Sequence, residues 1–190
     1  YIYPVSDVER ASLKTLETQA HWPIIACYQP LNTLPEATDL AQTPLPRALE
    51  VVVQQQIVEP AIESTLASEM PTLTPITDQV SQAVQAMYEE SPYPRWVRTP
   101  PHSQPQPLNE FLSRVFPLSG FKPLACDNPL QVLIAGGGTG QHPLHTARRF
   151  TGVQVQVIDL SRRSLAYARR KMQALGLNNL QFAQADILQI

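Results

Sequence analysis

Cysteine is scarce in this sequence, since only Cys27 and Cys126 are present and they lie far apart. They do not form the Cys-x-x-Cys spacing of redox and zinc sites, so we expect two buried, reduced thiols and no disulfide. No apolar run reaches the roughly 18 residues of a transmembrane helix, and the first residues show no signal-peptide pattern. These absences predict a cytoplasmic protein that does not contact a membrane.

Net charge is also low, with a formal value of −2 and an isoelectric point near 6.1. Such a chain has no field that would attract nucleic acid, so we do not expect nucleic acid as a partner. With 190 residues, of which 43% are hydrophobic, the chain can bury a core. Its first residue is Tyr1 rather than Met, so we expect a piece of a longer protein with further domains.

The most informative stretch is an apolar run that ends in a cluster of glycines. The run Val132–Ala135 predicts a strand that is buried on both faces of a parallel sheet. Gly136, Gly138 and Gly140 follow it, and a helical pattern comes next. Glycines in such a loop can adopt left-handed conformations and let a ligand approach the backbone. The stretch therefore predicts a strand, loop and helix that contact a ligand.

Two carboxylates follow at spacings that fit one ligand. Asp159 ends a second predicted strand, and it lies about 20 residues beyond Gly140, where an acid can accept hydrogen bonds from both hydroxyls of a ribose. A short third strand, Leu180–Phe182, leads to Asp186, where an adenine amine could be held. The ligand is therefore predicted to carry a nucleoside.

The glycine pattern, the run Asp-Leu-Ser that starts at Asp159, and the run Gln184-Ala-Asp-Ile187 together resemble three motifs of a known family. These are the first motifs of class I S-adenosylmethionine-dependent methyltransferases. The resemblance implies S-adenosyl-L-methionine as cofactor and methyl transfer to an unidentified acceptor. It implies the methionine part on the glycines, the ribose on Asp159 and the adenine amine on Asp186. The cofactor-binding residues that it implies are Ala135, Gly136, Gly137, Gly138, Gly140, Asp159, Leu160, Asp186 and Ile187.

Two other functions stay open beside the methyltransferase. One is an NAD-binding oxidoreductase domain, whose Gly-x-Gly-x-x-Gly fingerprint needs glycine or alanine where this chain has Gln141. The other is a Rossmann-like interaction module that binds no cofactor. The chain also has Ile134 where many members of the resembled family carry an acid. His142 and His145 are three residues apart without a third ligand nearby, so no metal site is predicted.

The N-terminal half has mainly helical patterns. Ser6 and Glu9 form a capping box that predicts a helix to about Thr18. The mostly apolar run His21–Tyr28 is predicted to be extended. Periodic apolar residues over Arg47–Ile62 predict a second helix.

Prolines and a polar cap divide the following stretch. Pro60 is predicted to kink or break the second helix, and Met70–Pro75 is predicted to cross as a linker. Thr77 is expected to cap the next helix. That helix carries an apolar stripe that we expect in the core, namely Val80, Val84, Met87 and Tyr88.

The segment Tyr93-Pro94-Arg95-Trp96 follows this helix, and Pro92 and Pro94 predict an extended turn there. It is either a rigid elbow that packs its aromatic rings on the domain or a cover across the cofactor mouth. The segment resembles one that precedes the methyltransferase domain in some proteins with tetratricopeptide repeats. Both interpretations stay open.

A proline-rich connector over residues 98–108 predicts a domain boundary. Residues 1–108 would be a helical N-terminal region that includes the connector. Residues 109–190 would be the N-terminal half of an S-adenosylmethionine-binding, Rossmann-like domain, beginning with a helix capped by Asn109.

Three parallel strands with right-handed crossovers predict an α/β fold, with the first three strands in the order 3-2-1. The helix between the second and third strands is predicted to start at Ser161 and to end before Gly176. The resembled fold has seven strands, and the sequence ends before the fourth. We therefore expect most cofactor contacts to be present and the acceptor contacts to be missing. The isolated chain should be inactive, and no catalytic residue can be assigned.

Overall fold

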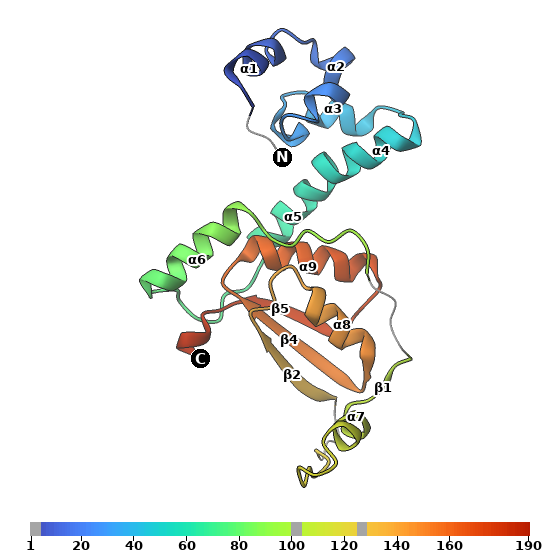
Figure 1. Cartoon of the computed structure of the whole chain (residues 1–190), viewed down its shortest axis with the longest axis vertical. Helices are drawn as coiled ribbons and strands as arrows, with labels where there is room; N and C mark the ends of the chain where they lie inside the picture. The colour runs from blue at the N-terminus through green and yellow to red at the C-terminus, as the bar shows by residue number, and fades with distance from the viewer. Residues whose placement is uncertain (1–4, 100–103, 125–128) are drawn as a thin grey trace. The chain divides into compact units, whose positions relative to one another are not determined.

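The computed structural model describes residues 5–99, 104–124 and 129–190, and Figure 1 labels their elements. The chain divides into two compact units, Tyr1–Ile62 and Glu63–Ile190, called here the N-terminal unit and the sheet unit. This division differs from the predicted one at residue 108. The reason is that Leu66, Met70 and Trp96 pack in the same core cluster as the strands of the sheet.

The N-terminal unit consists of short helices around a small apolar core. Its elements are α1 (Asp7–Leu13), α2 (Thr18–Ile25), η1 (Leu31–Thr33), α3 (Ala37–Gln42), α4 (Arg47–Val53), η2 (Gln54–Val58) and the start of α5 (Glu59–Ser68). Its core cluster contains Trp22, Ala26, Leu31, Leu40, Val53 and Ile57. The side chain of Gln56 crosses this unit, because it accepts from the Leu31 N–H and donates to the Ala26 carbonyl.

Two predictions for the start of the chain have different outcomes. The capping box of Ser6 and Glu9 is confirmed, although α1 ends at Leu13 rather than near Thr18. The extended stretch predicted for His21–Tyr28 is wrong, because α2 runs through most of it. The spacing of Trp22, Ile25 and Ala26 puts three buried side chains on one helix face, and their burial outweighs the one hydrogen bond that a proline removes.

Pro60 does not break the second predicted helix, which continues from Arg47 to Ser68 as α4, η2 and α5. The turn before the proline is π-helical, and the Glu59 N–H donates to the carbonyl of Gln54, five residues back. A wider turn at this point accommodates a residue without an N–H inside a continuous helix.

The sheet unit contains three parallel strands, β2 (Leu130–Ala135), β4 (Val153–Asp159) and β5 (Leu180–Gln184), in the order β2-β4-β5. This order confirms the predicted order 3-2-1 and the α/β fold class. The crossover helices α8 (Gln141–Arg149) and α9 (Arg162–Ala174) cover one face of the sheet (Figure 1).

Burial of β2 on both faces, as predicted, is wrong. Ile134 is buried on the helix-covered face, but Leu133 points to the other face and is 57% exposed. That second face also carries four glutamines, Gln131, Gln154, Gln156 and Gln181, as the strand register shows. Because the helices cover one face only, burial alternates along β2 with the period of a half-buried strand.

The region before β2 forms a small accessory structure. Strands β1 (Gln106–Pro107) and β3 (Phe150–Thr151) pair in parallel, and α7 (Leu108–Val115) follows β1. Asn109 does not cap this helix, because Pro107 occupies the N-cap position. The Asn109 amide instead exchanges two hydrogen bonds with the backbone of Leu124.

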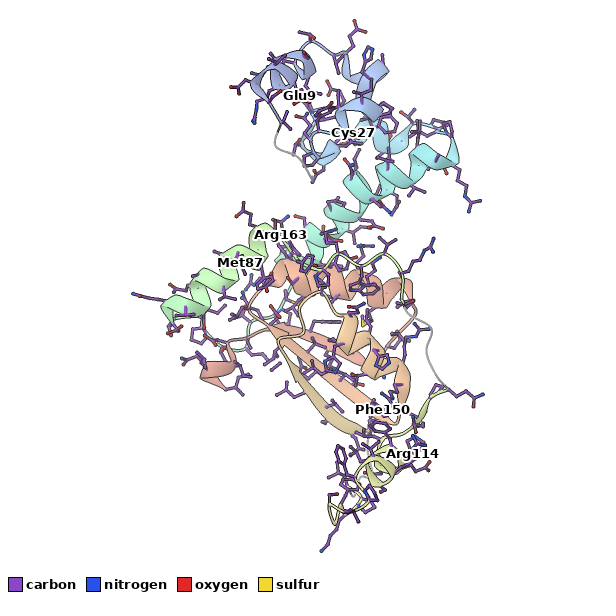
Figure 2. The ribbon with its side chains drawn as sticks, viewed as in Figure 1. Glu9, Cys27, Met87, Arg114, Phe150 and Arg163 are labelled. Atoms are coloured by element: carbon purple, nitrogen blue, oxygen red, sulfur yellow. The ribbon has the colours of Figure 1, made fainter. Side chains whose placement is uncertain are left out.

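Helix α6 (Gln79–Glu90) corrects two further predictions. Its cap is Asp78 rather than Thr77, because the Asp78 carboxylate accepts from two backbone N–H groups of the first turn. The predicted core stripe is also wrong, since Val80 is 70% exposed and Met87 is 55% exposed. Figure 2 labels Met87 on α6. The helix turns Ser81 inward instead.

Cys27 is exposed, so its predicted burial is wrong, and Cys126 lies outside the described residues. The thiol of Cys27 lies just after α2 and donates to the Pro23 carbonyl. None of the helices in the described ranges is long and apolar enough to span a membrane.

Candidate functional site

The glycine loop after β2 has left-handed backbone at alternate positions. Gly136, Gly138 and Gly140 have φ angles of 69°, 50° and 85°. Gly137, between the first two, lies so close to β4 that a Cβ atom there would be 2.1 Å from the Cγ1 of Val157. A side chain at Gly137 would therefore not fit without moving the strand behind it.

Asp159, at the carboxyl end of β4, is joined to this loop. One of its carboxylate oxygens accepts from the Gly138 N–H at 2.8 Å, and the other accepts from the Ser161 N–H at 2.9 Å. Ser161 then caps α9, since its hydroxyl accepts from the Ser164 N–H at 3.0 Å. The predicted start of this helix is therefore confirmed, and the carboxylate is fixed at the end of the strand.

Asp186, just past β5, is almost fully buried, with 1% of its surface exposed. Its Oδ1 accepts from the Leu188 N–H at 3.0 Å, and its own N–H donates to the Thr74 hydroxyl at 2.8 Å. Its Oδ2 is buried without any hydrogen-bond partner. An unpaired buried carboxylate oxygen is costly, so this atom fits a donor supplied by a ligand.

The glycine loop and both carboxylates meet in one pocket of about 680 Å³, a volume typical of ligand sites. All predicted cofactor residues line it except Ala135, whose side chain is exposed at the end of β2. The lining residues are Ser81, Val84, Tyr88, Tyr93, Pro94, Gly136, Gly137, Gly138, Thr139, Gly140, Gln141, His142, Ile158, Asp159, Leu160, Ser164, Ala185, Asp186, Ile187 and Leu188.

Sequence reasoning missed the wall that α6 contributes to this pocket. Val84 and Tyr88 line it, although their apolar spacing predicted core positions. The segment after α6 combines both interpretations left open above, because Tyr93 and Pro94 line the pocket while Trp96 packs behind the glycine loop. Only the prolines in that segment indicated a fixed turn near the cofactor.

The segment before α6 also contacts the site, through the end of β5. Thr72 forms a parallel bridge with Gln184, and the Gln184 backbone exchanges hydrogen bonds with Pro71 and Leu73. Met70–Pro75 was predicted to be a linker, and it crosses as one, but it also adds a short strand-like contact beside β5. This contact holds Thr74 against Asp186.

The end of α6 is fastened to the start of α9. The carboxylate of Glu89 accepts from the Arg162 N–H, and the Glu89 carbonyl accepts from the Arg163 guanidinium at 2.7 Å. Because Asp159 lies three residues before Arg162, α6 is tied to the segment that carries the Asp159 carboxylate.

The charged side chains that line the pocket are Asp159 and Asp186, and no lysine or arginine of the described residues lines it. His142 lines the pocket as well, whereas His145 is exposed on α8. Within the part of the chain that the structure describes, no three His, Cys, Asp or Glu side chains are grouped to hold a metal ion. The pocket therefore favours hydrogen-bond donors and positive charge.

Residues 132–190 match the sequence profile of a family described as "Methyltransferase domain". Over these residues the chain is similar to methyltransferase domains. The matched residues begin in β2 and include the glycine loop and both carboxylates of the pocket.

Two solved structures are similar to the chain. One, described as "Conversion of a Disulfide Bond into a Thioacetal Group during Echinomycin Biosynthesis", is 32% identical with a TM-score of 0.33, over 57% of this chain and 39% of that chain. The other, "Crystal Structure of the [4+2]-Cyclase SpnF", is 22% identical with a TM-score of 0.37, over 64% of this chain and 45% of that chain. The matched region thus spans less than half of either protein. No curated protein matches the chain.

Proposed function

We propose that this chain forms the cofactor-binding part of an S-adenosylmethionine-dependent methyltransferase whose acceptor is unidentified. The observation that carries the proposal is the Oδ2 atom of Asp186. This atom is buried without a hydrogen-bond partner, and Asp186 lines the pocket. In the resembled family this position faces the adenine amine, which is a hydrogen-bond donor. A ligand with that donor would give this carboxylate oxygen of the pocket the hydrogen-bond partner that it lacks.

The remaining contacts follow from the same arrangement. The ribose hydroxyls would bind Asp159, whose two oxygens already accept from backbone N–H groups at the mouth of the loop. Leu160 and Ile187 would flank the adenine. The methionine part would lie along Gly136, Gly137, Gly138 and Gly140 of the glycine loop, whereas Ala135 does not line the pocket.

Bound S-adenosylmethionine supplies an activated methyl group on a positively charged sulfonium. The protein's part in such an in-line displacement is mainly to position the reactants. Two carboxylates and no lining lysine or arginine among the described residues favour a positively charged ligand over its neutral product. His142 is the one lining residue with an imidazole, but nothing in its surroundings assigns it a proton-transfer role.

We also propose that the functional domain begins before the predicted boundary at residue 109. Residues 63–99 contact the glycine loop, Asp186 and the start of α9, which follows Asp159 and Leu160 in the chain. The methyl acceptor, further domains in a longer protein and a cytoplasmic location stay predictions from the sequence. An NAD-binding oxidoreductase and a non-catalytic module are the alternatives that binding measurements separate.

The test is calorimetric titration of the chain with S-adenosylhomocysteine and, separately, with NADH. We expect saturable binding of the first ligand only. Asp159→Ala should weaken it at least about tenfold, because charge-assisted hydrogen bonds to the ribose are lost. Since that carboxylate also orders the loop, Asp159→Asn serves as a second variant that keeps one acceptor oxygen. Saturable NADH binding would favour the oxidoreductase, and binding of neither ligand would favour the interaction module.

A further inference from the structure

Trp96 lies outside the pocket but is bonded to the middle of the glycine loop. Its indole N–H donates to the Thr139 carbonyl at 2.9 Å. In return the Thr139 hydroxyl donates to the Pro94 carbonyl at 2.7 Å. Both partners are buried, with Trp96 9% exposed and Thr139 2% exposed. The loop and the Tyr93–Trp96 segment are therefore joined by two hydrogen bonds, of which the one from Trp96 is buried and the one to Pro94 is partly buried.

The position of Thr139 in the loop lets these hydrogen bonds restrict the backbone of its neighbours. It stands between Gly138 and Gly140, which both have left-handed backbone. Glycine explores many backbone conformations, so a loop of this composition loses much entropy when it adopts one of them. Bonds at Thr139 restrict both of its glycine neighbours at once.

Trp96 is itself held firmly. Its ring meets the ring of Tyr167 edge to face, with centroids 5.9 Å apart, and the Tyr167 hydroxyl donates to the Trp96 carbonyl. The ammonium of Lys171 lies 5.1 Å from the centre of the indole. The backbone and the ring of Trp96 are both held against α9, so the hydrogen bond from its indole holds Thr139 at a fixed position relative to that helix.

The residue before it is anchored in the same way. The Arg95 guanidinium pairs with the Glu63 carboxylate at 3.0 Å and lies 4.6 Å from the centre of the Tyr167 ring. Glu63 also pairs with Arg170 of α9 at 2.8 Å. These contacts fix the direction from which the indole approaches Thr139.

We propose that Trp96 is a positioning residue for the cofactor site, which holds the glycine loop in its ligand-binding conformation through Thr139. This inference rests on the proposed function. Trp96 does not line the pocket, so its effect on binding acts through the loop. The loss of either hydrogen bond should let the loop sample other conformations and weaken cofactor binding, and the loss of the Trp96 N–H does so without changing a residue that lines the pocket.

The experiment compares Trp96→Phe with wild type in the full chain. Phenylalanine keeps an aromatic ring against Tyr167 but has no N–H for Thr139. We expect S-adenosylhomocysteine to bind about threefold to tenfold more weakly. In the ligand-free protein, the amides of residues 136–140 should exchange with deuterium faster, while those of β4 keep their rates. Trp22→Phe, the same substitution in the other unit, should change neither measurement.

A second pair of variants covers the case in which Trp96→Phe folds poorly. Thr139→Val removes the hydroxyl at nearly constant volume and should reproduce both the weaker binding and the faster exchange. Thr139→Ser keeps the hydroxyl and should retain the affinity and the exchange rates of wild type. Wild-type affinity and unchanged loop exchange in Trp96→Phe and Thr139→Val would overturn the inference. If wild type fails to bind S-adenosylhomocysteine, the proposed function fails, and the exchange rates alone still decide whether Trp96 holds the loop.

Discussion

The two units differ in what they bury. The core clusters of both units consist of apolar side chains, so the difference lies in the buried polar residues. Every buried polar or charged residue found among the described residues belongs to the sheet unit: Glu63, Ser81, Thr139, Thr146, Ser161, Ser164, Arg170, Gln184 and Asp186. Glycine follows the same division, because the first glycine of the sequence is Gly120.

This difference in buried polar residues distinguishes a unit whose interior only packs from one whose interior also lines a pocket. Burying a polar group is unfavourable unless it is paired, so a unit designed only to fold avoids it. The sheet unit accepts this cost at the carboxyl ends of its strands, where Asp186 keeps an unpaired oxygen. The described part of the N-terminal unit has no buried polar residue, although the Oε2 atom of Glu36 is buried there without a hydrogen-bond partner.

The largest effect that would sharpen this comparison is expected from Gly140→Ala. A Cβ atom there would lie 2.4 Å from the Cβ of Ala168 and 3.0 Å from its Cα, at a φ of 85°. Overpacking against the backbone of α9 and left-handed strain should together lower the free energy of unfolding of the sheet unit by about 3 kcal/mol. Denaturant unfolding followed by Trp96 fluorescence, in a Trp22→Phe background, measures it.

Gly152→Ala is the matched control for that variant. Its φ is 66°, so alanine meets the same backbone strain, but a Cβ atom there would have no neighbour within 4 Å. A cost of about 1 kcal/mol is expected. Equal losses of unfolding free energy in the two variants would mean that the contact between an added Cβ atom and Ala168 of α9 has no cost beyond the backbone strain.

The smallest effect is expected in the N-terminal unit, from Ser6→Ala. The Ser6 hydroxyl and then its backbone N–H donate to Glu9 and hold the pKa of that carboxyl below its ordinary value. A lowered pKa in the folded state means that this contribution to stability is present above the unfolded pKa and lost as pH falls through the folded one.

Ser6→Ala should therefore raise the pKa of Glu9 toward its ordinary value, as an NMR titration of the carboxyl carbon would show. The affinity for S-adenosylhomocysteine should stay unchanged. A weaker ligand in this variant would break the separation between the two units, because the cap lies far from the pocket in sequence and makes no described contact with it.

The parts of the site that follow a local pattern could be predicted from the sequence. The spacing of Gly136, Gly138 and Gly140 predicted glycine-specific backbone, and all three are left-handed. Asp159 and Asp186 follow consecutive parallel strands, whose carboxyl ends meet at one edge of a sheet. Their convergence in one pocket follows from that topology.

The rest depends on contacts between segments far apart in the sequence. Nothing local indicates that Thr74 donates to Asp186, or that Tyr88 lines a pocket rather than a core. The helix at Trp22 was missed for the same reason, since burial in a small core overrode the proline that follows it. Periodicity predicts that a helix has an apolar face, but it does not tell which neighbour, ligand or solvent that face meets.

The central proposal is that the Asp186 carboxylate accepts a hydrogen bond from the adenine amine of S-adenosylmethionine. The most direct test is a pair of titrations with S-adenosylhomocysteine and S-inosylhomocysteine, which carries an oxygen in place of the amine. The account predicts saturable binding of the first and at least about tenfold weaker binding of the second, because a carboxylate would then face an acceptor. Equal affinities for the two ligands would contradict it.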